Sequence, residues 1–245
     1  MEVHSHTHTP RKKFTHYLWE FLMLFLAVFC GFLAENVRER FVEKHREKQF
    51  VSSIAEDLKL DIHNLDSVIK RRNNREIMID SLILLLNSPE RDEHGSDIYY
   101  YARWLTYYYQ FVNSDRTISQ LKNSGNFRLI TNQEVSDQIM DYDQQVRWID
   151  PTNQREEVFI EQYIGFISEL FDSKVFDEML DKKYGFHKPA GNPKLLSKNP
   201  ALLQKLNMAV HFFKAINIFV RTWQTKQSDR AKSILAFIKH EYKLE

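Results

Sequence analysis

Three histidines near the N-terminus are the first residues whose type and spacing could do chemistry. His4, His6 and His8 alternate with polar residues in the tail 1–16, and imidazoles in such a row can hold a divalent metal ion weakly. The same composition is typical of a solvated polar tail, and we favour that interpretation because polar and basic residues surround the histidines. We therefore expect a flexible basic and histidine-rich tail, with no bound metal.

Three acidic residues lie close together at helical spacing in the first long helical pattern. Glu56, Asp57 and Asp61 fall within two turns of a predicted helix, where paired carboxylates could act on a substrate or bind a metal. Acids on an exposed helix face are usually solvated, so we expect no site there. His63 and His211 occupy two long predicted helices and could meet, but a helix histidine is more often structural than a ligand.

Motifs that define the common enzyme classes are missing from the sequence. No histidine follows an acid by three residues, as a di-iron bundle would require, and neither His-Glu-x-x-His nor Gly-x-Ser-x-Gly nor a P-loop occurs. A single cysteine, Cys30, excludes an intrachain disulfide and a cysteine-based zinc site. We predict a protein that is not an enzyme and uses no cofactor.

Aromatic residues form the most conspicuous local pattern. A predicted helix from Asp97 to about 112 would place Tyr101, Trp104, Tyr108 and Phe111 on one face. Such a face could bind a ligand or a partner, or it could pack into the core, where each ring buries a large apolar area. We favour packing in the core, and keep the four residues as the candidate ligand or partner face.

Composition favours helices throughout. Six glycines and six prolines in 245 residues are few chain breakers, which indicates long helices and not a turn-rich β fold. Lysine and arginine number 34 against 33 acids, so the net charge is +1. Nucleic-acid-binding proteins usually carry a basic excess or stripe, and the balance therefore argues against that partner.

Residues 17–35 read as a transmembrane helix. Tyr17 to Ala34 contains 18 residues with one acid, Glu20, and a span needs about 20 apolar residues. Bulky Phe32 and Phe29 stand where a signal peptidase or a lipoprotein site needs small residues, so we predict an uncleaved anchor. A buried soluble helix is the alternative, but apolar side chains cover every side. The anchor residues are Trp19, Phe21, Leu24, Phe25, Val28 and Phe32.

The sidedness of the anchor follows weakly from charge. The basic tail carries three lysines and arginines and is the only short flank, whereas long domains cross a membrane largely regardless of charge. We expect a single-pass protein of the bacterial inner membrane. The helical domain is placed in the periplasm, with the cytoplasm as the alternative.

The remainder, 36–245, is predicted to be one helical aqueous domain. Apolar residues recur every three or four positions from 37 to 68 and from 202 to 238, separated by a helix-weakening stretch at 71–74 and a loop at 185–199. We expect an all-α fold in which the transmembrane helix continues into a long-helix antiparallel bundle, coiled-coil-like, with shorter bracing helices. Thr131 to Glu134 predicts a capping box.

The middle segment 117–143 carries a resemblance. Its distinctive residues are Gln120, Leu121, Ser124, Gly125, Leu129, Ile130 and Tyr142. In these residues and in its layout the chain resembles the uncharacterised single-span, membrane-anchored helical proteins of Bacteroidota. That family has no assigned activity, so the resemblance implies a topology and no chemistry.

Two functions from different classes remain. The first is a membrane-anchored interaction or scaffold module, in contact with the lipid bilayer, that binds a protein partner or forms a homo-oligomer along its long helices. The second is a sensor-like helical domain that binds a small ligand at the aromatic residues. Because a tail of 16 residues is too short for an output domain, a sensor would signal through a partner.

Overall fold

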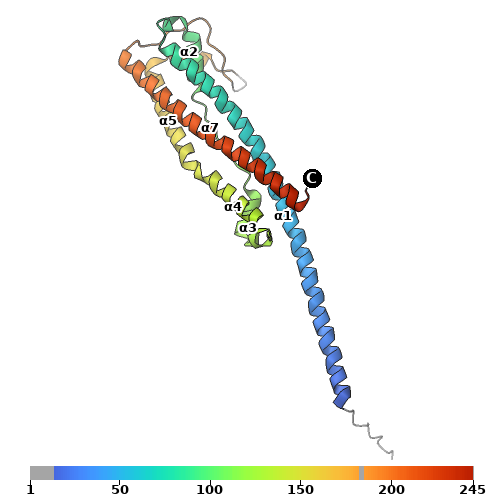
Figure 1. The fold of residues 1–245 in the computed structure, drawn as a ribbon. Coiled ribbons are helices and arrows are strands. Elements are labelled where there is room, and N and C mark those ends of the chain that lie inside the picture. The colour runs from blue at the N-terminus through green and yellow to red at the C-terminus, as the bar shows by residue number, and fades with distance from the viewer. Residues whose placement is uncertain (1–13, 182–184, 245) are drawn as a thin grey trace, which may run out of the picture. The chain divides into compact units, whose positions relative to one another are not determined.

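The computed structural model describes residues 14–181 and 185–244, and they form an all-α fold, as expected. The described residues contain no β-strand. The α-helices are α1 (Phe14–Leu86), α2 (Gly95–Trp104), α3 (Arg116–Asn123), α4 (Gln133–Trp148), α5 (Asp150–Leu170), α6 (Ser173–Glu178) and α7 (Pro200–Tyr242). Two short 3-10 helices, Arg91–Glu93 and Asn126–Leu129, lie in the connections (Figure 1).

The chain divides into two compact units, Met1–Gln49 and Phe50–Glu245. The described part of the first unit, residues 14–49, is helical, and its apolar side chains are exposed. Phe21, Phe25 and Phe29 stack along one side, with ring centroids 6.3 and 5.9 Å apart. Of the predicted tail, residues 1–13, with their three histidines, lie outside the described residues, and residues 14–16 belong to α1.

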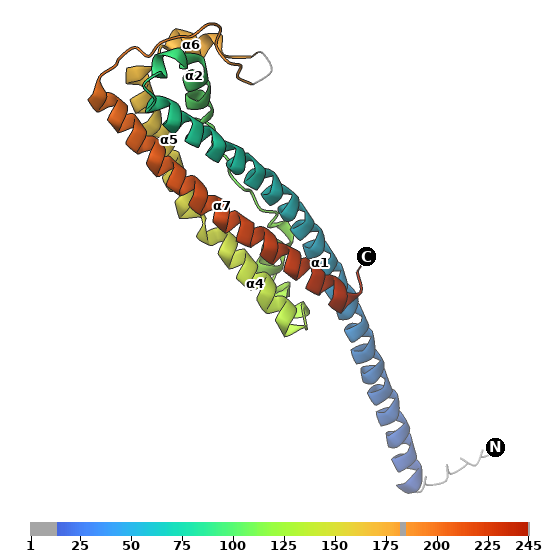
Figure 2. The ribbon, with the colours of Figure 1, turned by 45° about the horizontal axis from the view of Figure 1, so that its top comes forward.

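Within the second unit, α7 runs antiparallel to residues 50–86 of α1, as the two apolar repeats predict. Asn87 donates to Asn207 at 3.1 Å near one end, and Ser228 donates to Asp66 at 3.0 Å farther along. As residue numbers increase along α1, the numbers of the facing residues in α7 decrease, so the two helices are antiparallel. Figures 1 and 2 show α7 beside both α1 and the α4–α5 pair, so it is the central helix of the bundle.

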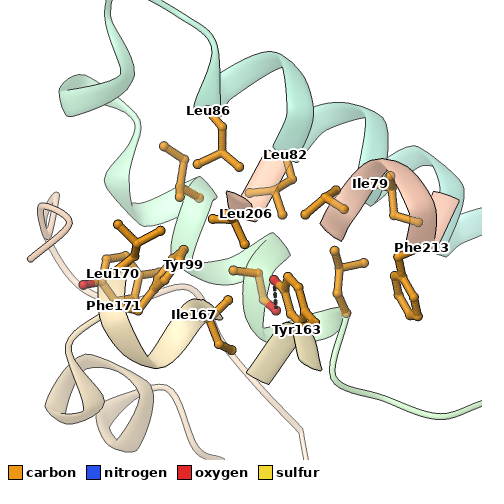
Figure 3. Packing of buried hydrophobic residues seen from close by; sticks show 14 of the residues in the cluster. Ile79, Leu82, Leu86, Tyr99, Tyr163, Ile167, Leu170, Phe171, Leu206 and Phe213 are labelled. Atoms are coloured by element: carbon orange, nitrogen blue, oxygen red, sulfur yellow. Dashed lines mark hydrogen bonds between the residues drawn. The ribbon is translucent and has the colours of Figure 1, made fainter. Parts of the chain in front are cut away.

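Two apolar clusters form the core of this unit. The first joins the C-terminal part of α1 to α2, α5 and the N-terminal half of α7, and Figure 3 shows Tyr99, Tyr163 and Phe213 within it. The Tyr163 hydroxyl donates to the carbonyl of Ala102 at 2.9 Å, so burial of this ring leaves no polar atom unsatisfied. The second cluster joins Val51–Leu65 to α3, α4 and the C-terminal half of α7.

Two local expectations were wrong. Residues 71–74 do not weaken α1, because the Arg72 side chain is buried in tertiary contacts that outweigh its neighbours' poor helix propensity. The cap of α4 is Asn132 and not Thr131: the Asn132 side chain accepts from the amide of Val135 at 3.2 Å.

Residues 185–199 form a long connection between α6 and α7 that is fixed against α2. Ser96 donates through its hydroxyl to the carbonyl of Pro189 at 3.1 Å, and Tyr99 donates to the carbonyl of Lys194 at 3.2 Å. A Cβ atom added to Gly95 would lie 1.8 Å from the carbonyl oxygen of Pro193. Glycine at position 95 thus lets the loop approach the start of α2.

Gly95→Ala tests this approach, with Gly165→Ala in α5 as its matched control. The new methyl at 95 has to displace the loop backbone, and we expect a loss of about 1–3 kcal/mol of stability. Gly165 has open space around its Cβ position, so alanine there should stabilise α5 by about 0.5–1 kcal/mol. Unfolding of the full chain in detergent measures both. Equal effects of the two substitutions would show that the loop does not pack on Gly95.

Candidate functional site

The four aromatic residues of the predicted face do not share a helix face. Helix α2 ends at Trp104, and residues 105–115 leave the helix, so Tyr108 and Phe111 lie beyond it. The physical reason is competition for backbone carbonyls. Arg72 donates to the carbonyl of Tyr109 at 2.7 Å and Arg75 donates to that of Tyr107, so both oxygens are taken by arginines of α1.

The structure distributes these aromatic residues between different surroundings. Tyr101 and Tyr108 are partly buried against the first apolar cluster, whereas Phe111 is buried in the second. Trp104 and Tyr108 line a surface pocket together with Arg75; we call it the aromatic pocket. The two other residues of the predicted face are not among its lining residues. The candidate face is therefore replaced by a pocket that shares two of its members.

The arginines that hold the 105–115 segment belong to a buried ionic cluster. Arg72 and Arg75 of α1 are 0% and 1% exposed, and both bind the carboxylate of Glu156 in α5, which is 0% exposed. Asn217 of α7 accepts from Arg72 at 3.3 Å and donates to the backbone carbonyl of Arg72 at 3.1 Å. We call Arg72, Arg75, Glu156 and Asn217 the arginine cluster. It joins three helices and an extended segment through charge-assisted hydrogen bonds.

Sequence analysis missed the arginine cluster. Arg72 and Arg75 lie in a run of seven polar residues, 70–76, part of which was interpreted as a weak point of the helix. A signal was present, because Arg72 and Arg75 continue the three- and four-residue spacing of Leu65 and Val68 towards Ile79. A charged residue in register with an apolar stripe is a candidate for burial with a partner.

The acids at 57 and 61 are not solvated, contrary to expectation. Asp57 is buried, and it accepts from the backbone amide of Thr117 at 3.2 Å and from Arg116 at 2.7 Å. Asp61 accepts from the amide of Ser114 at 2.6 Å and from the Tyr142 hydroxyl at 2.8 Å. Burial raises the pKa of Asp61, and the two hydrogen bonds oppose that rise. These acids attach the start of α3, and α4 behind it, to α1.

The third acid, Glu56, is exposed and pairs with Lys59 at 2.7 Å. The two histidines do not meet. His63 lies beside Asp66, which binds Ser228, whereas His211 lies between Asn207 and Lys214, which contact Asn87 and Asp80. The register separates the histidines by roughly 30 Å at 1.5 Å per residue. Among the described residues no group of three metal-ligating side chains occurs.

The predicted anchor is an exposed apolar helix segment. Helix α1 contains a window of 18 residues with mean hydropathy 2.0 and no buried residue, which is long and apolar enough to cross a membrane. The exposed side chains include every predicted anchor residue: Trp19, Phe21, Leu24, Phe25, Val28 and Phe32. His16 contacts Glu20 at 3.0 Å, so the single acid of the run has a partner at the helix end.

A second exposed apolar surface lies between α5 and α7. Phe159 and Phe166 of α5 face Met208 and Phe212 of α7 across a groove of about 350 Å³, the α5–α7 groove. Phe212 is 51% exposed, and Phe219 continues the apolar strip about two turns farther along α7. At the end of the strip the rings of Trp148 and Trp223 lie 4.8 Å apart. Exposed apolar side chains gathered in this way are typical of an interaction surface.

No protein-family model, no curated protein and no solved structure matches this chain. Function therefore has to be argued from the geometry of the arginine cluster, the aromatic pocket, the α5–α7 groove and the candidate span.

Glu156→Gln tests whether the arginine cluster holds the bundle together. Glutamine keeps the size of the side chain but leaves two buried guanidinium groups without a counter-charge, and we expect a loss of about 3–5 kcal/mol of stability. Glu157→Gln, at the adjacent exposed position, should change stability by less than about 0.5 kcal/mol. Denaturant unfolding of the full chain in detergent gives both values. A loss below about 1 kcal/mol for Glu156→Gln would mean that the cluster is dispensable.

Proposed function

We propose that this chain is a single-span membrane protein whose helical bundle binds another protein and catalyses no reaction. The observation that carries the proposal is the α5–α7 groove, an apolar surface of the bundle whose Phe159 and Phe166 also pack against the first core cluster. The candidate span supports the membrane part, because its apolar side chains are exposed on all sides and have no protein partner within the described residues that would bury them.

The shape of the groove suits an α-helix of the partner. Met208, Phe212 and Phe219 follow one side of α7 at helical spacing, over roughly 16 Å at 1.5 Å per residue. An amphipathic helix of about three turns can lay its apolar face along such a length, between the flanking helices α5 and α7. Lys205 is the one charged residue among those lining the groove, so an acidic residue beside the apolar face of the partner fits best.

The orientation in the membrane is part of the same proposal. The basic tail remains in the cytoplasm of a bacterial inner membrane and the bundle lies in the periplasm, as the short basic flank favours. A partner helix would then be presented by a periplasmic or membrane protein.

A ligand-binding sensor that signals through a partner is the second candidate function. It is favoured by the aromatic pocket, where Trp104 and Tyr108 meet Arg75.

A photo-crosslinking amino acid placed at Phe212 tests the groove in the full chain in its native membrane. We expect a crosslinked adduct that contains a helical segment of one other protein, and no such adduct from the adjacent exposed position His211. Phe212→Asp should lower recovery of that protein at least tenfold, because it puts a charge where an apolar contact forms.

Two further experiments test the anchor and its orientation. Carbonate-washed membranes should retain the chain, and protease added to spheroplasts should digest the bundle.

Three results would contradict parts of the proposal. An adduct with a second copy of this chain would make the groove a homo-oligomer interface. Equal adducts from positions 212 and 211 would remove the groove as an interaction surface. Release of the chain by carbonate would remove the anchor, and protection from protease would place the bundle in the cytoplasm.

A further inference from the structure

The aromatic pocket combines cationic and aromatic side chains within the second unit. Arg71, Asn74, Arg75 and Met78 enter it from one face of α1, at the three- and four-residue spacing of a helix. Trp104 at the end of α2 and the tyrosines at 107–109 form the other wall. The pocket measures about 440 Å³, within the range of small-molecule sites. Arg71 and Asn74 are exposed at its rim, whereas Arg75 is buried.

Positive charge exceeds negative charge around this pocket. Arg72 and Arg75 share the one carboxylate of Glu156, so among the described residues one buried positive charge has no carboxylate of its own. Arg71 adds a further cation at the rim. Burial raises the pKa of Tyr109, so its hydroxyl stays neutral and supplies no counter-charge. A surplus charge in a poorly hydrated site favours the binding of an anion.

Two buried N–H donors on pocket residues have no acceptor among the described residues. They are Nε of Arg75 and Nε1 of Trp104. Arg75 already uses its two terminal nitrogens, one for Glu156 and one for the carbonyl of Tyr107. An unmade hydrogen bond of a buried donor is costly, so an acceptor that reaches either donor would be bound favourably.

The walls of the pocket are flat rings. The guanidinium carbon of Arg75 lies 4.3 Å from the centroid of the Tyr109 ring, and the rings of Trp104 and Tyr107 lie 5.0 Å apart. Aromatic surfaces attract another ring by stacking or by edge-to-face contact. The pocket therefore offers an aromatic surface for a ring and cationic donors for an acidic group.

We propose that the aromatic pocket binds a small aromatic carboxylate, with its ring against the surface that Trp104 and the tyrosines form and its carboxylate at Arg71 and the free donors. The excess of arginine excludes a metal ion or an organic cation as the occupant. The inference rests on the second candidate function and is independent of the α5–α7 groove, so each can fail without the other.

Isothermal titration of the full chain in lipid nanodiscs with 2-naphthoate tests the inference. We expect saturable binding, about tenfold weaker with Arg71→Gln, which removes an exposed cation outside the core. Trp104→Phe keeps a ring but removes the indole donor, and it should weaken binding severalfold. Arg128→Gln, an exposed arginine of another segment, should bind as the wild type does. Circular dichroism of each variant verifies its folding.

Two probes separate the two recognition elements. The neutral analogue 2-naphthamide should bind at least tenfold more weakly than 2-naphthoate, since it lacks the charge, and acetate should bind weakly because it lacks the ring. Equal binding of naphthoate and naphthamide, or an unchanged affinity in both Arg71→Gln and Trp104→Phe, would overturn the inference. Absence of saturable 2-naphthoate binding to the folded wild type would also overturn the inference, and it would say nothing about the α5–α7 groove.

Discussion

Two buried arginines that share one carboxylate are the interaction on which the rest of the bundle depends. Along α1 the arginine cluster lies between the second apolar cluster, which reaches Leu65, and the first, which begins at Ile79. Glu156 and Asn217 hold the corresponding positions in α5 and α7. The two apolar clusters supply most of the burial. The arginine cluster between them is the point where three helices must meet in one register.

This matters because apolar faces alone specify register weakly. Leucine and isoleucine at three- and four-residue spacing can pack in several offsets, since neighbouring turns look alike. A guanidinium without its carboxylate is strongly unfavourable in the interior, so an offset of one turn is penalised. The same arginines also bind the carbonyls of Tyr107 and Tyr109, in the non-helical segment after α2 that forms a wall of the aromatic pocket. Fold and pocket therefore have a common physical origin.

Much of the architecture could be predicted from the sequence, because it follows from periodic apolar residues. The long helices and their antiparallel pairing came from stripes such as Leu58 to Val68 and Leu206 to Val220. Local caps were less predictable, because Asn132 and not Thr131 caps α4. The candidate span was evident from composition, and the 18-residue apolar window agrees with it.

The polar interior was not predictable in the same way. Whether Asp57 or Asp61 is solvated depends on the segment that folds back over α1, and that segment is distant in sequence. Tyr108 and Phe111 were placed on a helix face because local spacing allowed it, whereas the arginines of α1 decided the backbone there. The exposed strip along α7 was likewise hidden among its buried apolar positions: Phe212 and Phe213 are adjacent, and only the latter is in the core.

Hydrogen exchange of the arginine side chains tests the central claim most directly. The Nε–H signals of Arg72, Arg75 and Arg71 can be followed by nuclear magnetic resonance in the ¹⁵N-arginine-labelled full chain. Burial in the arginine cluster predicts that Arg72 and Arg75 exchange only on global unfolding, while exposed Arg71 exchanges rapidly. Exchange of Arg75 as fast as that of Arg71 would contradict a buried cluster, and with it the account of the fold and of the pocket.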